Sequence, residues 1–266
     1  MSGLRFSRKS LGIPYAVFLL LFVLGPVLVL FYYAFTNSTG VFTLSNFTQF
    51  FTNANTIGTL CYSFALAFCT TVVCLLIAYP TAYLLARSGV KNSAVWLMIF
   101  VMPMWINFSL RITALKELLT AIEGNLAYYP FVNSVIGMTY DFLPFMILPL
   151  YTALSGIDDS YIEAARDLGA DPMHAFVQVT LPLSVPGIIS GVSMVFLPSM
   201  TNYVILDMLY NSTYIMGSLI GGYFSAYNWH GGSMIALILL AIISVFTLLT
   251  QGAEDDAAAQ RGGSLL

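Results

Sequence analysis

The most informative spacing of polar side chains lies between residues 156 and 187, in the segment GIDDSYIEAARDLGADPMHAFVQVTLPLSVPG. Ser160 and Glu163 have the spacing of a capping box, in which each side chain bonds to the backbone amide of the other residue. This pattern predicts a helix that begins at Tyr161. Gly169 suits the left-handed position that commonly ends a helix, so the first helix is expected to stop there.

A second short helix is predicted directly after this glycine. Asp171 can cap it, and Pro172 fits its first position because a proline has no amide hydrogen to lose there. The pair Leu181-Pro182 is expected to end it. Together the segment predicts a rigid elbow of helix, glycine turn and helix. His174 lies in the middle of the elbow without a second histidine nearby, and it is interpreted as a surface residue.

The sequence contains no constellation typical of an enzyme. It has no GxxxxGK(S/T) phosphate-binding motif and no clustering of nucleophile and base or of metal ligands. Cys61, Cys69 and Cys74 share one apolar stretch without a CxxC pair, which argues against a zinc site or a disulfide framework. The chain is therefore expected to be non-catalytic and to need no cofactor or metal.

The composition is that of a membrane protein. Of the 266 residues, 59% are hydrophobic and 8% are charged, whereas soluble domains carry about 25% charged residues. The mean hydropathy is +0.86. The formal net charge of -3 is too small to indicate a partner. The sequence has no basic patch interleaved with aromatic residues, so no nucleic-acid partner is expected.

The apolar runs predict an all-α, polytopic membrane fold. Each run is continuous, which favours helices over a barrel, and each is long enough to cross about 30 Å of hydrocarbon. Gly187 and Gly191 have the small-xxx-small spacing that allows close helix packing. The six predicted spans lie near residues 12–35, 59–86, 93–110, 132–153, 184–206 and 232–250.

The same reading predicts the domain organisation. Residues 1–11 form a cytoplasmic N-terminus, 12–250 the six-helix domain with its loop at 157–182, and 251–266 a polar cytoplasmic tail that is expected to be disordered. The first apolar run exceeds the length of a signal peptide and no small-x-small site follows it, so it is interpreted as a retained span.

The basic residues predict the orientation of the chain. With both termini in the cytoplasm, seven of the nine Lys and Arg residues lie inside, and only Arg111 and Lys116 lie outside. The elbow is then cytoplasmic.

The elbow resembles a known family. Glu163-Ala164-Ala165, three residues, Gly169, nine residues, Val179 and then Leu181-Pro182 are similar to the EAA loop of the MetI-like permease subunits of binding-protein-dependent ABC importers. The resemblance implies a coupling helix at Ala170 to Gln178 that docks on a separate ATPase. The residues that it places in this coupling contact are Glu163, Ala164, Ala165, Gly169, Asp171, Pro172, Met173, Phe176, Leu181 and Pro182.

Within that family, the chain resembles the spermidine/putrescine permeases of the PotB type. The segments NFSLRITALKELL (107–119) and YDFLPFMILPLYTAL (140–154) carry this resemblance beside the EAA loop, whereas the stretch after Pro198 departs from the branch. The resemblance implies a bacterial plasma-membrane protein whose partners are a second, PotC-like permease, two ATPase subunits and an extracellular substrate-binding protein.

Two aspartates are candidates for a cation path. Asp141 lies within the fourth span, where a carboxylate is costly unless it faces water or a partner; the alternative is an ion pair or hydrogen bond to a neighbouring helix. Asp207 lies near the outer end of the fifth span, where anchoring at the interface is the alternative. The candidate path consists of Asp141, Tyr140, Trp105, Asp207 and Tyr203.

Other functions stay open at this stage. An importer of another small solute, such as an amino acid or sulfate, has the same architecture, although no Arg or Lys is expected to be buried among the spans to attract an anion. A stand-alone secondary transporter predicts inverted repeats and several intramembrane charges. Neither feature is evident in the sequence.

Overall fold

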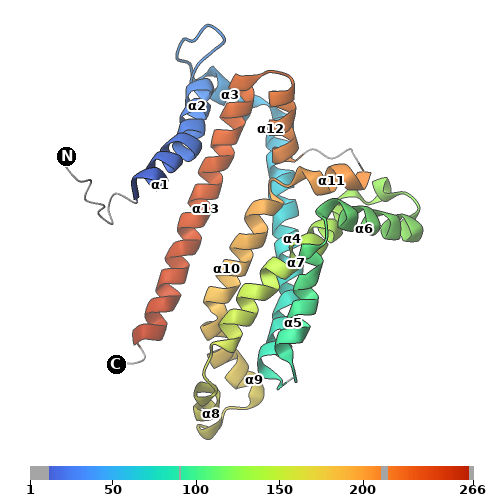
Figure 1. The fold of residues 1–266 in the computed structure, drawn as a ribbon, viewed down its shortest axis with the longest axis vertical. Helices are drawn as coiled ribbons and strands as arrows, with labels where there is room; N and C mark the ends of the chain where they lie inside the picture. The colour runs from blue at the N-terminus through green and yellow to red at the C-terminus, as the bar shows by residue number, and fades with distance from the viewer. Residues whose placement is uncertain (1–11, 90, 211–214, 264–266) are drawn as a thin grey trace, which may run out of the picture. The chain divides into compact units, whose positions relative to one another are not determined.

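The computed structural model describes residues 12–89, 91–210 and 215–263, and helices make up nearly all of this part (Figure 1). The described residues form two compact units. Unit 1 comprises residues within 1–57 and 218–242, and unit 2 comprises residues within 58–217 and 243–266.

Unit 1 brings the N-terminal part of the described chain together with residues 218–242. Asn46 donates to the backbone oxygens of Ala34 and Thr36 at 3.0 and 3.1 Å, and the ring Nδ1 of His230 lies 3.0 Å from the oxygen of Tyr33. Its elements are α1 (Gly12–Leu19), the π-helical turn η1 (Leu20–Leu24), α2 (Gly25–Ala34), α3 (Ser45–Thr52), the start of α4 (Ala54–Arg87), most of α12 (Met216–Ser225) and the first part of α13 (Trp229–Gly263).

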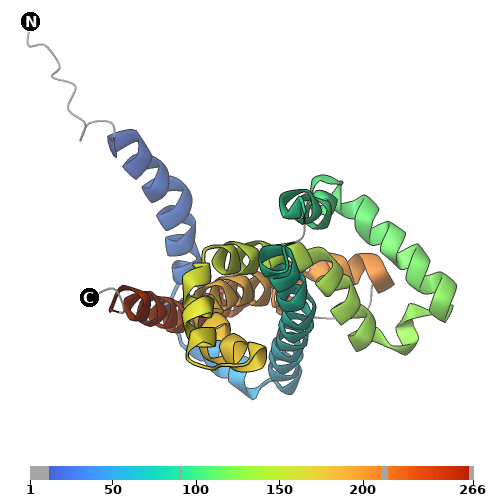
Figure 2. The same ribbon diagram turned by 90° about the horizontal axis from the view of Figure 1, so that it is seen from below.

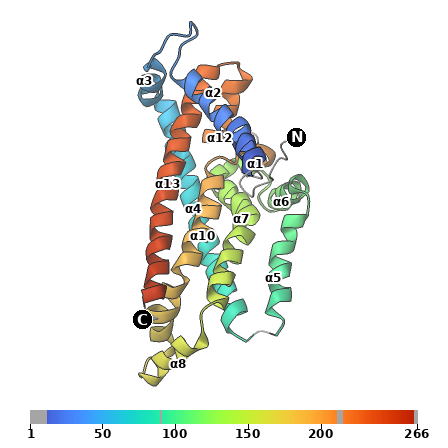
Figure 3. The same ribbon diagram turned by 60° about the vertical axis from the view of Figure 1, so that its left-hand side comes forward.

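Unit 2 holds the remaining helices. Its core is the packing of α7 along α10, which Figures 1 and 3 both show side by side. Its elements are most of α4, α5 (Ser93–Val101), η2 (Met102–Trp105), α6 (Phe108–Glu123), η3 (Leu126–Tyr128), α7 (Pro130–Ser155), α8 (Asp159–Asp167), α9 (Pro172–Ala175), η4 (Phe176–Thr180), α10 (Leu181–Ser199), α11 (Tyr203–Tyr210) and the end of α13.

The predicted polytopic all-α fold is confirmed. Within the part of the chain that the structure describes, five helices are long and apolar enough to cross a membrane, and a bent pair makes a sixth if it is counted as one span. The five are Pro14–Ala34, Ala54–Arg87, Pro130–Ser155, Pro172–Ser199 and Trp229–Gly252, and the pair is Ser93–Trp105 with Phe108–Glu123.

The third predicted span, 93–110, is wrong as one straight helix. The chain bends by 96° between Trp105 and Phe108, so that α6 turns sideways from α5 (Figure 3). Asn107 accounts for the new start, because its side-chain oxygen accepts from the amides of Ser109 and Leu110 and so caps α6.

Two other predicted boundaries differ from the structure. α10 ends at Ser199 and α11 begins at Tyr203, so the fifth span ends before the predicted residue 206. At the C-terminal end, α13 continues as helix to Gly263, whereas a disordered tail was predicted from 251. The alanine-rich composition there favours helix, since alanine has the highest helix propensity.

The glycine prediction for α10 is confirmed. A Cβ at Gly187 would overlap the Cβ of Ala153 and lie 2.9 Å from the oxygen of Pro149, and one at Gly191 would lie 2.6 Å from the sulfur of Met146. Only glycine allows α10 to pack this closely against α7.

We expect Gly187→Ala to destabilise unit 2 by about 1–3 kcal/mol, the usual cost of forcing an extra methyl into a packed core. The measurement is the thermal unfolding midpoint of the purified protein in detergent. Gly58→Ala in α4 is the matched control, because no atom lies within 4 Å of its added methyl. Equal midpoints for the two variants would contradict the close packing of α7 and α10.

Candidate functional site

The predicted elbow is present in unit 2, where α8 and α9 lie beyond the lower ends of α7 and α10 (Figure 1). In the view from below, the elbow is nearest to the viewer (Figure 2). The first helix begins two residues earlier than predicted. Asp158, not Ser160, is its cap, because the carboxylate of Asp158 accepts from the amide of Ser160 at 2.9 Å. This bond lowers the pKa of Asp158.

The turn between the two helices has the predicted glycine geometry. Gly169 has a φ of +88°, which is the left-handed region. Its amide donates to the oxygen of Arg166 at 2.9 Å and that of Ala170 donates to the oxygen of Ala165 at 3.0 Å. These two bonds form a Schellman motif, which satisfies the last carbonyls of α8 and sets the direction of the chain into α9.

The second helix begins as predicted, with Asp171 as its cap and Pro172 at its first position. The carboxylate of Asp171 accepts from the amide of His174 at 2.7 Å, and this bond lowers the pKa of Asp171. The cap is therefore ionised at neutral pH, and its contribution to helix stability is lost as the pH falls through this lowered pKa.

Asp171→Ala should weaken the start of α9 by roughly 1 kcal/mol, the common cost of losing a cap. Asp171→Asn is the matched control, because asparagine caps helices as well as aspartate does. Hydrogen–deuterium exchange at residues 172–176 measures the difference. Faster exchange is expected only in the alanine variant, and equal rates in the two variants would contradict the capping role.

The predicted end of this helix at Leu181-Pro182 is wrong. The chain passes through the π-helical turn η4 directly into α10. Pro182 has no amide hydrogen, and the amide of Leu181 bonds to the oxygen of Phe176, five residues back. The wider turn therefore carries the helix past the proline.

The apolar residues of the elbow divide into two faces. Phe176 faces inward, where its ring centroid lies 6.0 Å from that of Tyr79 and 5.4 Å from that of Tyr83, both edge-to-face. Met173 is 67% exposed and Leu168 is 90% exposed. Met173, Phe176 and Val177 have the i, i+3, i+4 spacing of one apolar stripe, but they do not form one surface. Leu168, which the sequence reading missed, belongs to the exposed part.

The elbow is also tied to the end of α4. Arg87 Nη1 lies 2.5 Å from Oδ1 of Asp159, and the two residues border a hollow of about 210 Å³ that Glu163 and Arg166 also line. Tyr79 Oη lies 2.9 Å from Oγ of Ser184, just beyond the π-helical turn. The elbow therefore rests on α4 through side chains that the sequence reading did not single out.

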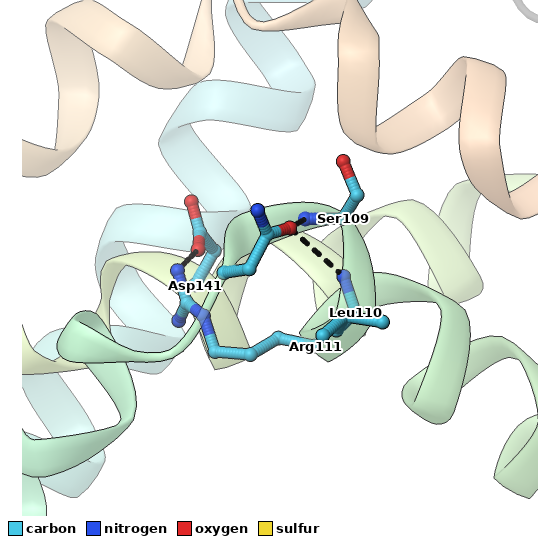
Figure 4. Close-up of polar contacts among 5 residues, drawn as sticks. Ser109, Leu110, Arg111 and Asp141 are labelled. Atoms are coloured by element: carbon cyan, nitrogen blue, oxygen red, sulfur yellow. Dashed lines mark hydrogen bonds and ion pairs between the residues drawn. The ribbon is translucent and has the colours of Figure 1, made fainter.

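A buried ion pair joins α6 to α7 in unit 2 (Figure 4). Arg111 Nη2 of α6 lies 2.6 Å from Oδ1 of Asp141 of α7, and each side chain is 8% exposed. The expectation that no Arg is buried among the spans is wrong. The opposite charges of Arg111 and Asp141 were a sequence signal for this pair. A single charge is costly in an apolar setting, so two opposite charges there are expected to pair.

The remaining residues of the predicted path are not gathered around Asp141. Tyr140 borders a hollow of about 550 Å³ whose wall is otherwise largely apolar, and Trp105, Asp207 and Tyr203 are not among its lining residues. These three side chains are all exposed. In unit 2 alone, the five residues do not form one site.

The comparisons with known proteins identify the class. Residues 78–255 match the family described as "Binding-protein-dependent transport system inner membrane component". The chain belongs to this family, so it is a non-catalytic, multi-pass permease subunit of an ABC importer, and the predicted family resemblance is confirmed.

Two relatives show which permeases this chain resembles in sequence. The chain is 32% identical to the spermidine/putrescine transport system permease protein PotB of Haemophilus influenzae, over 91% of each chain. It is 30% identical to PotB of Escherichia coli K12, over 79% of this chain and 82% of the relative.

Solved structures share the fold. A bacterial ABC transporter for the import of the acidic polysaccharide alginate matches with a TM-score of 0.69 at 15% identity, over 93% of this chain and 94% of the other. The methionine ABC transporter MetNI, in an inward-facing conformation, matches with a TM-score of 0.58 at 18% identity, over 76% and 95%.

Proposed function

We propose that the chain is the permease subunit of an importer for polyamines such as spermidine and putrescine. The observation that carries this proposal is the 32% identity to the H. influenzae spermidine/putrescine permease over 91% of both chains, together with the elbow. An importer for a different small solute is the second candidate, since structures of this fold belong to transporters of alginate and methionine.

The proposal includes the partners and the orientation. The exposed side chains of Leu168, Met173 and Val177 form the apolar part of a surface on the elbow that docks on the ATPase. Two ATPase subunits bind the cytoplasmic side, a second and different permease packs against this chain, and an extracellular binding protein delivers the solute. Both termini then lie in the cytoplasm.

For the cation path, Asp207 replaces Asp141 as the first candidate. The carboxylate of Asp141 is held by Arg111 and is largely shielded, whereas Asp207 is exposed on α11, four residues after the exposed Tyr203. An exposed carboxylate beside an aromatic ring offers a polyamine both an ion pair and a cation–π contact. Tyr140 and Trp105 are further candidates for the path, at positions apart from Asp207 and Tyr203.

We expect Asp207→Asn to raise the apparent KM for spermidine about two- to fivefold, the effect of losing one solvent-exposed charge interaction. Glu117→Gln, on the exposed side of α6, is the control and should leave the KM unchanged. Uptake of radiolabelled spermidine in cells is the measurement. An unchanged KM for Asp207→Asn would remove this aspartate from the path.

Reconstitution tests the function itself. The chain is purified with its companion permease, ATPase and binding protein, and placed in liposomes with internal ATP. Uptake of spermidine that is competed by putrescine, but not by sulfate or amino acids, is the expected result. Uptake of another solute in place of polyamines would support the second candidate, and uptake without any ATPase would overturn both.

A further inference from the structure

Arg87 is the last residue of α4, and its surroundings are unusual for a cation. Its side chain is 9% exposed, yet the carboxylate that it contacts, that of Asp159, is 81% exposed. A positive charge is favoured at the C-terminal end of a helix by the helix dipole. The burial of the guanidinium under the elbow goes beyond what this position requires.

Two further N–H groups of the Arg87 guanidinium are placed to donate hydrogen bonds. Nε and Nη2 are buried and have no hydrogen-bond partner within the described part of the chain. Buried donors without acceptors are costly, and a guanidinium fork can serve two carboxylates at once.

A second carboxylate, that of Glu163, lies at the same hollow as Arg87. Glu163 follows Asp159 by four residues on α8, which puts both side chains on the same face of that helix. Glu163 lines the hollow at Arg87 and, among the described residues, makes no ion pair. Arg166 is the remaining charged residue of this hollow, and it is exposed.

We propose that Arg87 is a positioning residue that holds the elbow to α4 by sharing its guanidinium between Asp159 and Glu163. The observations that carry it are the buried, unpartnered Nε and Nη2 and the two carboxylates on the facing side of α8. This inference rests on the proposed function. Its consequence is that α4 and the elbow move as one body when the ATPase acts.

A double-mutant cycle in the reconstituted transporter tests the shared contact. The measured quantity is the number of ATP molecules hydrolysed per solute imported, on complexes that retain the ATPase. Arg87→Gln should raise this number about tenfold, and Glu163→Gln should raise it several-fold on its own. Glu163→Gln should have no further effect when Arg87 is already replaced.

The possible results distinguish a shared contact from independent effects of Arg87 and Glu163. If the two effects multiply, Glu163 acts independently of Arg87 and the proposal is overturned. Arg166→Gln is the matched control, and it should stay within about twofold of the wild type because it removes a charge from the same hollow without removing an ion pair. If Arg87→Gln does not assemble, Asp159→Asn replaces it in the cycle, and purely multiplicative effects again overturn the proposal.

The proposed function and this inference also fail in different ways. Absence of an ATPase from the purified wild-type complex would refute the function. A complex that forms normally but couples equally well with Arg87→Gln would refute the positioning role alone.

Discussion

Asp141→Asn should greatly reduce the amount of folded protein in the membrane, instead of yielding a stable permease with lower uptake. The amide keeps the shape of the side chain but leaves the buried guanidinium of Arg111 without a counter-charge. Removing one partner of a buried ion pair commonly costs about 3–5 kcal/mol. The yield of membrane-inserted protein and its thermal unfolding midpoint in detergent measure the effect.

The reciprocal variants complete this test. Arg111→Gln should be as damaging as Asp141→Asn, whereas the double variant Arg111→Met with Asp141→Leu should recover much of the loss, because it removes both charges together. Asp207→Asn, at an exposed position, is the control for stability. A well-folded Asp141→Asn protein with impaired spermidine uptake would instead return Asp141 to the substrate path.

Gly169→Val should abolish most ATP-driven transport without unfolding the spans. A β-branched residue in the left-handed region costs of the order of 1–3 kcal/mol, and relieving that cost requires a different turn between α8 and α9. The Schellman bonds of Gly169 and Ala170 would break, and the elbow would lose its direction. Transport per ATP hydrolysed should fall by about tenfold or more, since 1.4 kcal/mol corresponds to a factor of ten.

The variant Gly169→Asn separates the effect of the left-handed backbone conformation from the effect of side-chain size. No atom lies within 4 Å of a Cβ at this position, so neither variant clashes with a neighbour. Asparagine tolerates the left-handed region far better than valine does, and it should keep most of the coupling. Normal coupling in the valine variant would show that the geometry of the turn is not required.

The elbow was largely predictable because its signals are local. Gly169, Asp171 and Pro172 act on the backbone within a few residues, so sequence spacing alone specifies their roles. The error at its start has the same origin, since Asp158 and Ser160 are both good caps and only the three-dimensional path of the chain selects one.

The sequence suggested an ion pair for Asp141 as an alternative, but the partners in the buried contacts could not be read from it. Arg111 and Asp141 are thirty residues apart, and their pairing depends on the 96° bend that folds α6 back to α7. Likewise, Phe176 has the periodicity of an exposed docking stripe, but its ring packs on Tyr79 and Tyr83, which lie almost a hundred residues away in the chain. Periodicity predicts which residues share one face of a helix, but it does not predict which other residues pack on that face.

The π-helical turn at η4 has a mechanical consequence. Because it keeps the backbone bonded past Pro182, residues Pro172–Ser199 form one rod of 28 residues, roughly 42 Å long at 1.5 Å per residue. Between Pro172 and Ser199 the helix has no break, and Pro186 inside α10 is a point at which it can bend, because proline donates no backbone hydrogen bond. If the elbow docks on the ATPase as proposed, a displacement at Pro172 is expected to pass along this helix to the break before α11.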